Sequence, residues 1–302
     1  MPKALISGLS GQDASYLVEL LLSKGYIVYG TLRRSVNKDL KYIDHLPVYR
    51  YWATLENYAS IYKVVQAVKP DEVYHLAAQS FVTNSFEDEF STMSANINGT
   101  HHILNACKEI VPNCKFYFAG TSEMFGNQPS PQTLKTPLHP VSPYGISKLA
   151  GYNLCNYYRD AYNMFICTGI LFNHESPRRG KEFVTQKIAQ AAKNKQTVHL
   201  GNLEARRDWG FAGDYVEAMW LMLRPAIVND YVIATGVTHS VREFAELAYR
   251  LVGLDYRDYV IEDKTFYRPN ELHELRGDNT YNVYIGWKPK TTFEQLVEMM
   301  VC

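Results

Sequence analysis

The sequence predicts an α/β protein with a doubly wound parallel sheet and a smaller, discontinuous second lobe. Short runs of β-branched residues alternate with longer segments of helical period, which is the pattern of successive strand–helix–strand units. A turn that contains glycine joins the first expected strand to the first expected helix, as is typical of such sheets. With 302 residues, the chain can form two domains or one large domain with an added lobe.

The first strand is expected over Lys3 to Ser7, and a helix over Asp13 to Lys24 follows it. Apolar residues such as Leu17 and Leu21 share one face of this helix, and Gly25 can end it. The remaining strands are expected over Tyr26 to Leu32, Glu72 to Leu76, Lys115 to Ala119 and Phe165 to Leu171, and the remaining helices over Ala59 to Val68, Met93 to Cys107 and Ser142 to Tyr162.

The regular alternation weakens near Asn173, where stretches rich in Asn, Arg, Gly and Pro begin. Two later segments, Asp214 to Leu223 and Tyr231 to Thr235, still have the patterns of a core helix and a core strand. We therefore expect a Rossmann domain over residues 1–172, to which the chain returns at about 208–236. Residues 173–302 would mainly form the second lobe.

Composition excludes several classes of protein. Lys and Arg together number 31, as do Asp and Glu, so no global charge favours nucleic acid or an anionic membrane. No apolar run reaches membrane-spanning length, and the N-terminal residues lack a signal-peptide pattern. The 5 cysteines are scattered, which suits reduced thiols and a cytoplasmic location. The 9 histidines form no ligand motif, so no metal site is expected.

The turn after the first strand has the pattern of a dinucleotide-binding loop. Gly8 permits a tight turn, Gly11 permits close approach of a pyrophosphate, and Ala14 takes the third, packing position. The helix that follows would offer its N-terminal backbone N–H groups to the phosphates. A glycine loop without a ligand is the alternative. The residues expected to contact the cofactor here are Gly8, Ser10, Gly11, Gln12 and Asp13.

The end of the second strand indicates which dinucleotide is bound. A site for NAD normally places a carboxylate there for the ribose 2′-hydroxyl, whereas this sequence has Arg33 and Arg34. Two guanidinium groups favour a 2′-phosphate, so NADP is preferred over NAD. The alternative is a solvated basic turn, since surface arginines are common.

A second group of residues suggests acid–base chemistry. Tyr144 and Lys148 lie four residues apart and therefore on one face of the expected helix, where the ammonium group can lower the pKa of the phenol. Such a pair also arises by chance. Here, however, Thr121 and Glu123 follow a buried strand and would face the crevice at its carboxyl end.

The combination resembles the extended short-chain dehydrogenase/reductase family, and more closely its GDP-mannose 4,6-dehydratase branch. Three later motifs resemble that branch in particular, namely Asn173 to Gly180, Gly201 to Gly210 and Tyr267 to Glu271. The resemblance implies a catalytic set of Thr121, Glu123, Tyr144 and Lys148. It also implies cofactor contacts from Leu76, Ala77, Ala78, Ser80, Tyr144, Lys148, His174 and Arg179, and substrate contacts from Ser122, Asn173, Lys187, Arg207, Arg268 and Glu271.

The implied reaction is the NADP-dependent 4,6-dehydration of a nucleotide-diphosphate hexose, with GDP-mannose as the expected substrate. Tyr144 would take the O4 proton while a hydride leaves C4, and Glu123 would then remove the C5 proton so that water leaves C6. The hydride would return to C6. A 4-keto sugar reductase or a 4-epimerase would need Tyr144 and Lys148 but not Glu123. A non-catalytic NADP-sensing or scaffold protein would be free to lose Tyr144 or Lys148, and both are present.

The sequence also departs from the family pattern. Thr54 stands where the family usually has an aspartate near the adenosine, and Gly213 stands where a basic residue is usual. The segment from Ser35 to Leu46 is short, whereas the family uses a longer loop there to reach a neighbouring subunit. We therefore expect a homodimer rather than a tetramer.

Overall fold

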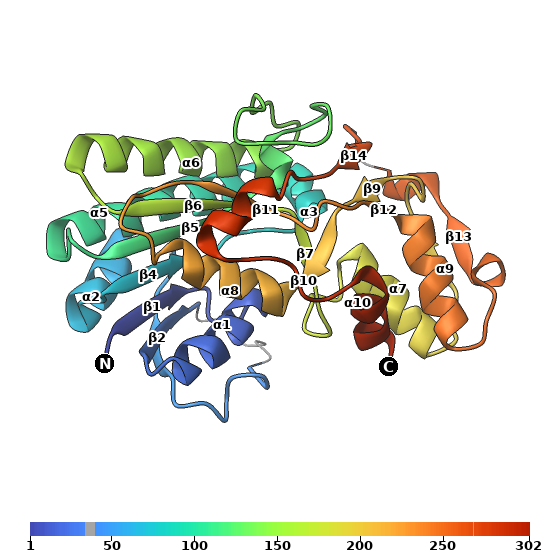
Figure 1. Ribbon diagram of the computed structural model, residues 1–302, viewed down its shortest axis with the longest axis horizontal. Helices are drawn as coiled ribbons and strands as arrows, with labels where there is room; N and C mark the ends of the chain where they lie inside the picture. The colour runs from blue at the N-terminus through green and yellow to red at the C-terminus, as the bar shows by residue number, and fades with distance from the viewer. Residues whose placement is uncertain (34–39, 268) are drawn as a thin grey trace.

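The computed structural model describes residues 1–33, 40–267 and 269–302, and a seven-stranded parallel sheet forms its centre (Figure 1). The strand order is β11-β6-β5-β4-β1-β2-β3, with all neighbouring pairs parallel. The doubly wound sheet predicted from the sequence is confirmed. Its strands are β1 (Lys3–Ser7), β2 (Ile27–Leu32), β3 (Tyr49–Trp52), β4 (Glu72–His75), β5 (Lys115–Thr121), β6 (Ile166–Leu171) and β11 (Tyr231–Ile233).

Helices cover both faces of this sheet. The cluster on one face includes Leu17 of α1 (Gln12–Ser23) and Met219 of α8 (Ala212–Met222). The cluster on the other face draws on α2 (Tyr58–Val68), α5 (Gly99–Ile110) and α6 (Pro143–Tyr162). Burying two apolar faces in this way provides the main stabilisation of a parallel sheet.

The helix expected over Met93 to Cys107 differs in the structure. After α3 (Val82–Glu87), the chain forms α4 (Glu89–Met93), a π-helical turn at Ser94–Asn98, and then α5. The wide turn carries Asn96, which is 3% exposed. Its side chain accepts a hydrogen bond from the Gln79 backbone N–H and donates to the Gln79 carbonyl and to Ser147 Oγ. Tertiary hydrogen bonds thus accompany the departure from regular α-helix.

The second lobe has a core of its own, at the right of Figure 1. Its helices are α7 (Val184–Lys193), α9 (Val241–Leu251) and α10 (Phe293–Val301), and its parallel strand pair is β8 (Val198–Leu200) with β13 (Val260–Glu262). Short strands lie between the sheet and this core: β7 (Asn173–Glu175), β9 (Arg206–Arg207), β10 (Trp209–Phe211), β12 (His239–Ser240) and β14 (Glu274–Leu275).

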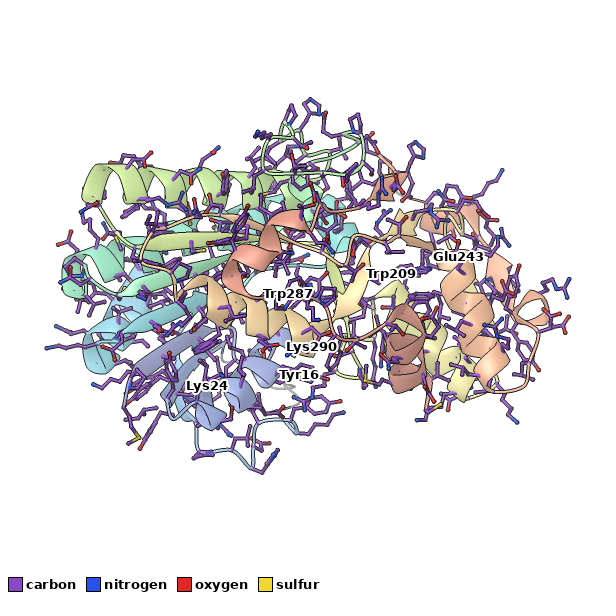
Figure 2. All side chains as sticks on the ribbon, viewed as in Figure 1. Tyr16, Lys24, Trp209, Glu243, Trp287 and Lys290 are labelled. Atoms are coloured by element: carbon purple, nitrogen blue, oxygen red, sulfur yellow. The ribbon has the colours of Figure 1, made fainter. Side chains whose placement is uncertain are left out.

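The chain returns from this lobe to the first domain twice. The first return supplies α8 and β11, which pack on α1 and pair with β6. In the second return, the segment at Thr280–Ile285 brings Trp287 back to the first domain (Figure 2). The indole N–H of Trp287 donates to the Asp214 carbonyl over 2.7 Å. None of the helices in the described ranges is both long enough and apolar enough to cross a membrane.

Candidate active site

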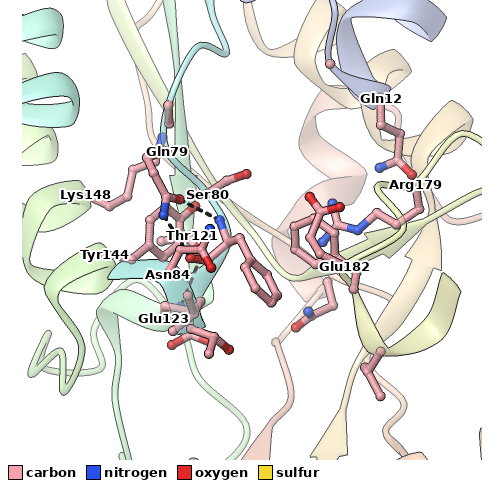
Figure 3. A pocket seen from close by; sticks show the side chains of 18 of the residues that line it. Gln12, Gln79, Ser80, Asn84, Thr121, Glu123, Tyr144, Lys148, Arg179 and Glu182 are labelled. Atoms are coloured by element: carbon pink, nitrogen blue, oxygen red, sulfur yellow. Dashed lines mark hydrogen bonds between the residues drawn. The ribbon is translucent and has the colours of Figure 1, made fainter. Parts of the chain in front are cut away.

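A cavity of about 880 Å³ lies at the carboxyl ends of the parallel strands, between the sheet and the second lobe. Residues that follow β1, β2, β4, β5 and β6 line one part of it, and residues from α7, β8 and β9 line another. In Figure 3, Tyr144, Glu123 and Lys148 lie on one wall, and Arg179 and Glu182 lie on the facing wall. Crevices at this edge of an open α/β sheet are the usual place for ligands.

The glycine turn brings two loops of the cavity together. Gly8 has a φ of +80°, and a Cβ atom there would lie 2.8 Å from the Ala77 Cα. The Ser7 hydroxyl accepts hydrogen bonds from the backbone N–H groups of Leu76 and Ala77, each over 3.1 Å. A larger residue at position 8 would therefore separate the loops after β1 and β4.

Buried His75 stabilises the same junction. Its ring nitrogens lie 2.7 Å from Ser7 Oγ and 3.0 Å from Thr100 Oγ1. Burial, together with the charge of Lys148, lowers the pKa of His75 to about 3, so the ring is neutral at physiological pH. One nitrogen then accepts and the other donates, which suits a chain from Ser7 to Thr100.

The start of α1 fits the phosphates of a dinucleotide. Gly11 is its N-cap residue and supplies no side-chain cap, and both Gly11 and Gln12 line the cavity. A Cβ at Gly11 would lie 3.3 Å from the Gly8 carbonyl oxygen, tighter than most such contacts, so hydrogen suits this position best. The backbone N–H groups at this helix end have the polarity that anions require.

Asp13 and His174 join the glycine turn to the segment after β6. His174 Nε2 lies 2.9 Å from Asp13 Oδ2, and Nδ1 lies 2.8 Å from the Phe172 carbonyl oxygen. Burial opposes charge on this imidazole, but the Asp13 carboxylate outweighs it, so the pKa of His174 is raised. The pKa of Asp13 is lowered despite burial, because His174 favours the charged carboxylate. The two side chains therefore favour each other's charged form at the cavity wall.

The four residues of the expected catalytic set line the same cavity. Thr121 and Glu123, each 9% exposed, lie at the end of β5 and in the short helical turn that follows. Tyr144 and Lys148 lie in the first turns of α6, which begins at a Ser142 cap. Two elements distant in sequence thus place a phenol, a carboxylate and an ammonium group in one chamber.

The sequence predicts that Lys148 lowers the pKa of Tyr144, but the structure shows no such lowering. Burial raises the pKa of Tyr144 above its ordinary value, although a hydrogen bond with Thr121 works in the opposite direction. The Lys148 ammonium group lies 6.0 Å from the centre of the Tyr144 ring and donates to the Ala119 carbonyl over 2.8 Å. At that distance, its charge does not compensate for removal of the phenol from water.

All the described residues that the sequence predicts for the site line the cavity. They include the residues predicted to contact the substrate, most of which lie further along the chain. Arg207 donates to the Leu272 carbonyl over 2.9 Å, and its guanidinium lies 3.7 Å from Glu271. Lys187 lies 5.6 Å from the ring centre of Phe266. Ser122, Asn173 and Arg33 also line the cavity. Arg34 and Arg268 lie outside the described residues.

Comparison with known sequences decides the family. Residues 5–300 match the family described as GDP-mannose 4,6 dehydratase. The chain belongs to this family.

Curated members of the GDP-mannose 4,6-dehydratase family align with nearly the whole chain. GDP-mannose 4,6 dehydratase 1 of Arabidopsis thaliana is 46% identical over 99% of this chain and 88% of its own length. The human GDP-mannose 4,6 dehydratase is 42% identical over 99% of this chain and 90% of its own length. The Vibrio cholerae GDP-mannose 4,6-dehydratase is 38% identical, with coverage of 99% and 92%.

Solved structures of more distant proteins share the fold. The UDP-glucose 4-epimerase of Thermus thermophilus, solved with NAD, has a TM-score of 0.91 and is 24% identical, with 99% of this chain and 97% of that chain covered. The dTDP-glucose 4,6-dehydratase of Bacillus anthracis, also solved with NAD, has a TM-score of 0.87 and is 20% identical, with 100% and 96% covered. At these identities, the likeness establishes the fold alone.

The departures from the family pattern at Thr54 and Gly213 lie outside the cavity wall. Both positions are described, and neither lines the cavity, although Ala53 and Leu55 do. Gly213 lies in the first turn of α8, where a Cβ atom would come within 2.3 Å of the Phe211 ring. A basic side chain at position 213 would therefore require Phe211 to move.

Several residues that line the cavity were missed by sequence reasoning. Phe81 directly follows the motif that ends at Ser80, and Phe183 immediately precedes α7. Their ring centres lie 5.4 Å apart. No local signal identifies them, because Phe183 offers no capping side chain and an aromatic residue is usually part of a core. Only the fold brings them together.

Proposed function

We propose that this protein converts GDP-mannose to GDP-4-keto-6-deoxymannose, as a hydro-lyase with NADP held in the same cavity. The observation that carries this proposal is the presence of two separate acid–base groups, Tyr144 and Glu123, on the wall of one chamber. Family membership and relatives that bear the name GDP-mannose 4,6-dehydratase support it. Because 4,6-dehydration requires proton removal at two positions, one base would not be enough.

The dinucleotide would lie along the glycine turn. Gly8 to Gln12 and the uncapped start of α1 would hold its phosphates, and Ala77 and Ala78 would line the opposite side. Arg33, which is exposed on the cavity wall, would pair with a 2′-phosphate. When bound, the nicotinamide accepts a hydride from the sugar and later gives it back.

Tyr144 would act at the first proton transfer. Its phenolate oxygen would accept the proton of the sugar O4 hydroxyl, and the hydrogen bond with Thr121 stabilises that phenolate. The Lys148 ammonium group lies 6.0 Å from the ring centre and does not offset the effect of burial. Since burial raises the pKa of Tyr144, the Thr121 contact matters to its ionisation.

Glu123 would act at the second proton transfer, the removal of the C5 proton. A ketone at C4 acidifies the C5 hydrogen, which a carboxylate in this position can remove. The same group, once protonated, would supply the proton with which the C6 hydroxyl leaves as water. A 4-keto sugar reductase or a 4-epimerase is the second candidate, and neither requires this carboxylate.

The variant Glu123→Gln tests whether Glu123 is the base that removes the C5 proton. It keeps the size of the side chain and removes its basicity, so turnover to the dehydrated product should fall by about 10² to 10⁴. Reduced dinucleotide should still form, because C4 oxidation does not need Glu123. Glu182→Gln makes the same chemical change on the facing wall and serves as the control. Wild-type turnover to the dehydrated product in Glu123→Gln would show that Glu123 is not the C5 base, and a wild type that forms no dehydrated product would favour the reductase or epimerase.

The cofactor preference is tested by replacing Arg33 and Arg34 with alanine. Binding of NADP should weaken by roughly 1.5 to 3 kcal/mol for each charged hydrogen bond lost, while binding of NAD changes little. Calorimetric titration with each dinucleotide measures the difference. Equal losses for the two dinucleotides would show that neither arginine contacts a 2′-phosphate.

Assembly and location complete the proposal. We propose a homodimer formed through the outer faces of α5 and α6, where the exposed Tyr157 and Tyr162 have their ring centres 5.7 Å apart. A cytoplasmic location agrees with Cys107, Cys114 and the other buried cysteines being free thiols.

A further inference from the structure

Two phenylalanine rings meet across the cavity. Phe81 lies in the loop after β4 and Phe183 lies at the N-terminal end of α7, and both line the cavity. Their ring centres are 5.4 Å apart and their planes meet at 75°, an edge-to-face arrangement. The chain neighbours Ser80 and Glu182 lie on facing walls in Figure 3. The contact therefore joins the first domain to the second lobe.

The Phe81 side of the contact is firmly held. Gln79 Oε1 accepts a hydrogen bond from the Phe81 backbone N–H over 2.8 Å, and Gln79 Nε2 donates to the Phe81 carbonyl over 3.2 Å. The backbone of Gln79 is in turn bound at both polar groups by the side chain of Asn96 in the π-helical turn. Two layers of hydrogen bonds thus fix the position from which this ring projects.

The Phe183 side has a separate support. The Arg179 guanidinium carbon lies 3.5 Å from the centre of the Phe183 ring. Arg179 Nε lies 3.0 Å from Glu175 Oε2, which also accepts a hydrogen bond from Thr185 Oγ1 over 2.6 Å. Glu175 and Thr185 are 2% and 1% exposed, so this support is built into the second lobe.

The contact between the Phe81 and Phe183 rings is apolar and weak, whereas the segments that carry the two rings are held by hydrogen bonds and an ion pair. A single edge-to-face pair favours its closed form by roughly two- to tenfold, so it can open to admit a nucleotide sugar and close again. While closed, the contact adds no polar group to the cavity that could bind water. The two walls of the cavity would then separate less readily.

We propose that Phe81 and Phe183 form an aromatic bridge that retains the oxidised sugar in the cavity between C4 oxidation and reduction at C6. This inference rests on the proposed function. Oxidation removes the O4 proton and one hydride from C4, and the sugar becomes a ketone as the dinucleotide is reduced. A ketone that escapes therefore leaves one reduced dinucleotide behind, and retention allows the hydride to return to C6. Both phenylalanines are positioning residues in this role.

The test uses Phe81→Leu, Phe183→Leu and the double variant, with GDP-mannose and NADP. The quantity measured is reduced dinucleotide accumulated per dehydrated product formed. Each single variant should raise this ratio by roughly two- to tenfold, and the double variant should raise it no further, because the same contact is lost. An unchanged ratio, or effects that multiply in the double variant, would overturn the bridge.

Two controls separate this role from simple loss of structure and from failure of the proposed function. Phe90→Leu removes an 89% exposed ring from α4, outside the cavity, and should leave the ratio unchanged. Hydrogen exchange at the Phe81 amide should also stay slow in Phe183→Leu.

If the wild type made no dehydrated product, the dissociation rate of GDP would test the bridge instead. That rate should rise above the wild-type rate by the same factor in the single and double variants. A rate that stays at the wild-type value in every variant would refute the bridge.

Discussion

Lys148 is buried in the cavity wall, and its ammonium group donates to the Ala119 carbonyl. Burial lowers its pKa from 10.5 to about 8. Between these values the folded protein binds fewer protons at this site than the unfolded chain does. The free energy of unfolding contributed by Lys148 therefore rises with pH from about 8 to 10.5, and the cost of the buried charge is present in full below pH 8.

Replacing Lys148 with methionine tests whether the pKa of Lys148 is lowered in the folded protein. Without bound dinucleotide, the difference in free energy of unfolding between wild type and variant should shift in favour of the wild type by about 2 kcal/mol from pH 7 to pH 9.5. Urea titration at the two pH values measures it. Lys63→Met, at an exposed position in α2, controls for loss of a positive charge. A difference that stays constant with pH would contradict a lowered pKa.

At the scale of single residues, the sequence predicted which side chains line the cavity but did not predict their charge state. The glycine turn predicts the place of Gly8, the spacing to Lys148 predicts that of Tyr144, and the position after a buried strand predicts that of Glu123. The raised pKa of Tyr144 depends on burial, which no spacing reveals. The pairing of Asp13 with His174 joins residues 161 positions apart, so it too required the fold.

At the scale of elements, the π-helical turn at Ser94–Asn98 connects a helix to the cavity. The apolar periodicity of Met93 to Cys107 predicts one continuous helix, and the structure departs from it where Asn96 binds Gln79 and Ser147. Such a turn depends on partners from a different loop and a different helix. Local pattern therefore predicts that a helix exists here but not how it is interrupted.

Asn96→Ala should loosen this connection. The change leaves both backbone groups of Gln79 without the Asn96 amide, and each unmade buried hydrogen bond costs about 1 to 3 kcal/mol. We expect a loss of about 2 to 4 kcal/mol in the free energy of unfolding, with faster hydrogen exchange at Gln79 and Phe81. Asn105→Ala in α5 removes an exposed hydrogen bond donated by Tyr58 and a long bond of 3.5 Å to Tyr158, and it should cost far less. Equal losses for the two variants would argue against a special role of the turn.

At the scale of the whole molecule, the parallel sheet was predictable because its strands alternate with helices of regular period. The small sheets of the second lobe were not. Strand β9 has two residues and lies between β12 and β14, whose residues come more than 30 positions later in the chain. Strands this short have too few residues for a period of two to emerge. Their pairing is decided by the packing of the lobe around the cavity.

Assembly is the remaining property at this scale. Along α6, Ile146 and Tyr157 are 45% and 52% exposed, and the spacing of eleven residues puts them on one side of the helix. Apolar side chains repeated on one helix face are typical of a contact with a second copy, and a twofold contact lets α5 and α6 of two chains meet.

The wild type should therefore have the mass of a dimer in light scattering at micromolar concentration, and Tyr157→Glu should shift it to the monomer by placing a charge in the contact. Ile227→Glu changes a 76% exposed residue in the loop before β11 and should leave the mass unchanged. Tyr157 belongs to the outer face of α6 and Tyr144 to the cavity, so the monomer should still bind dinucleotide. A stable tetramer, or a dimer that survives Tyr157→Glu, would place the contact elsewhere.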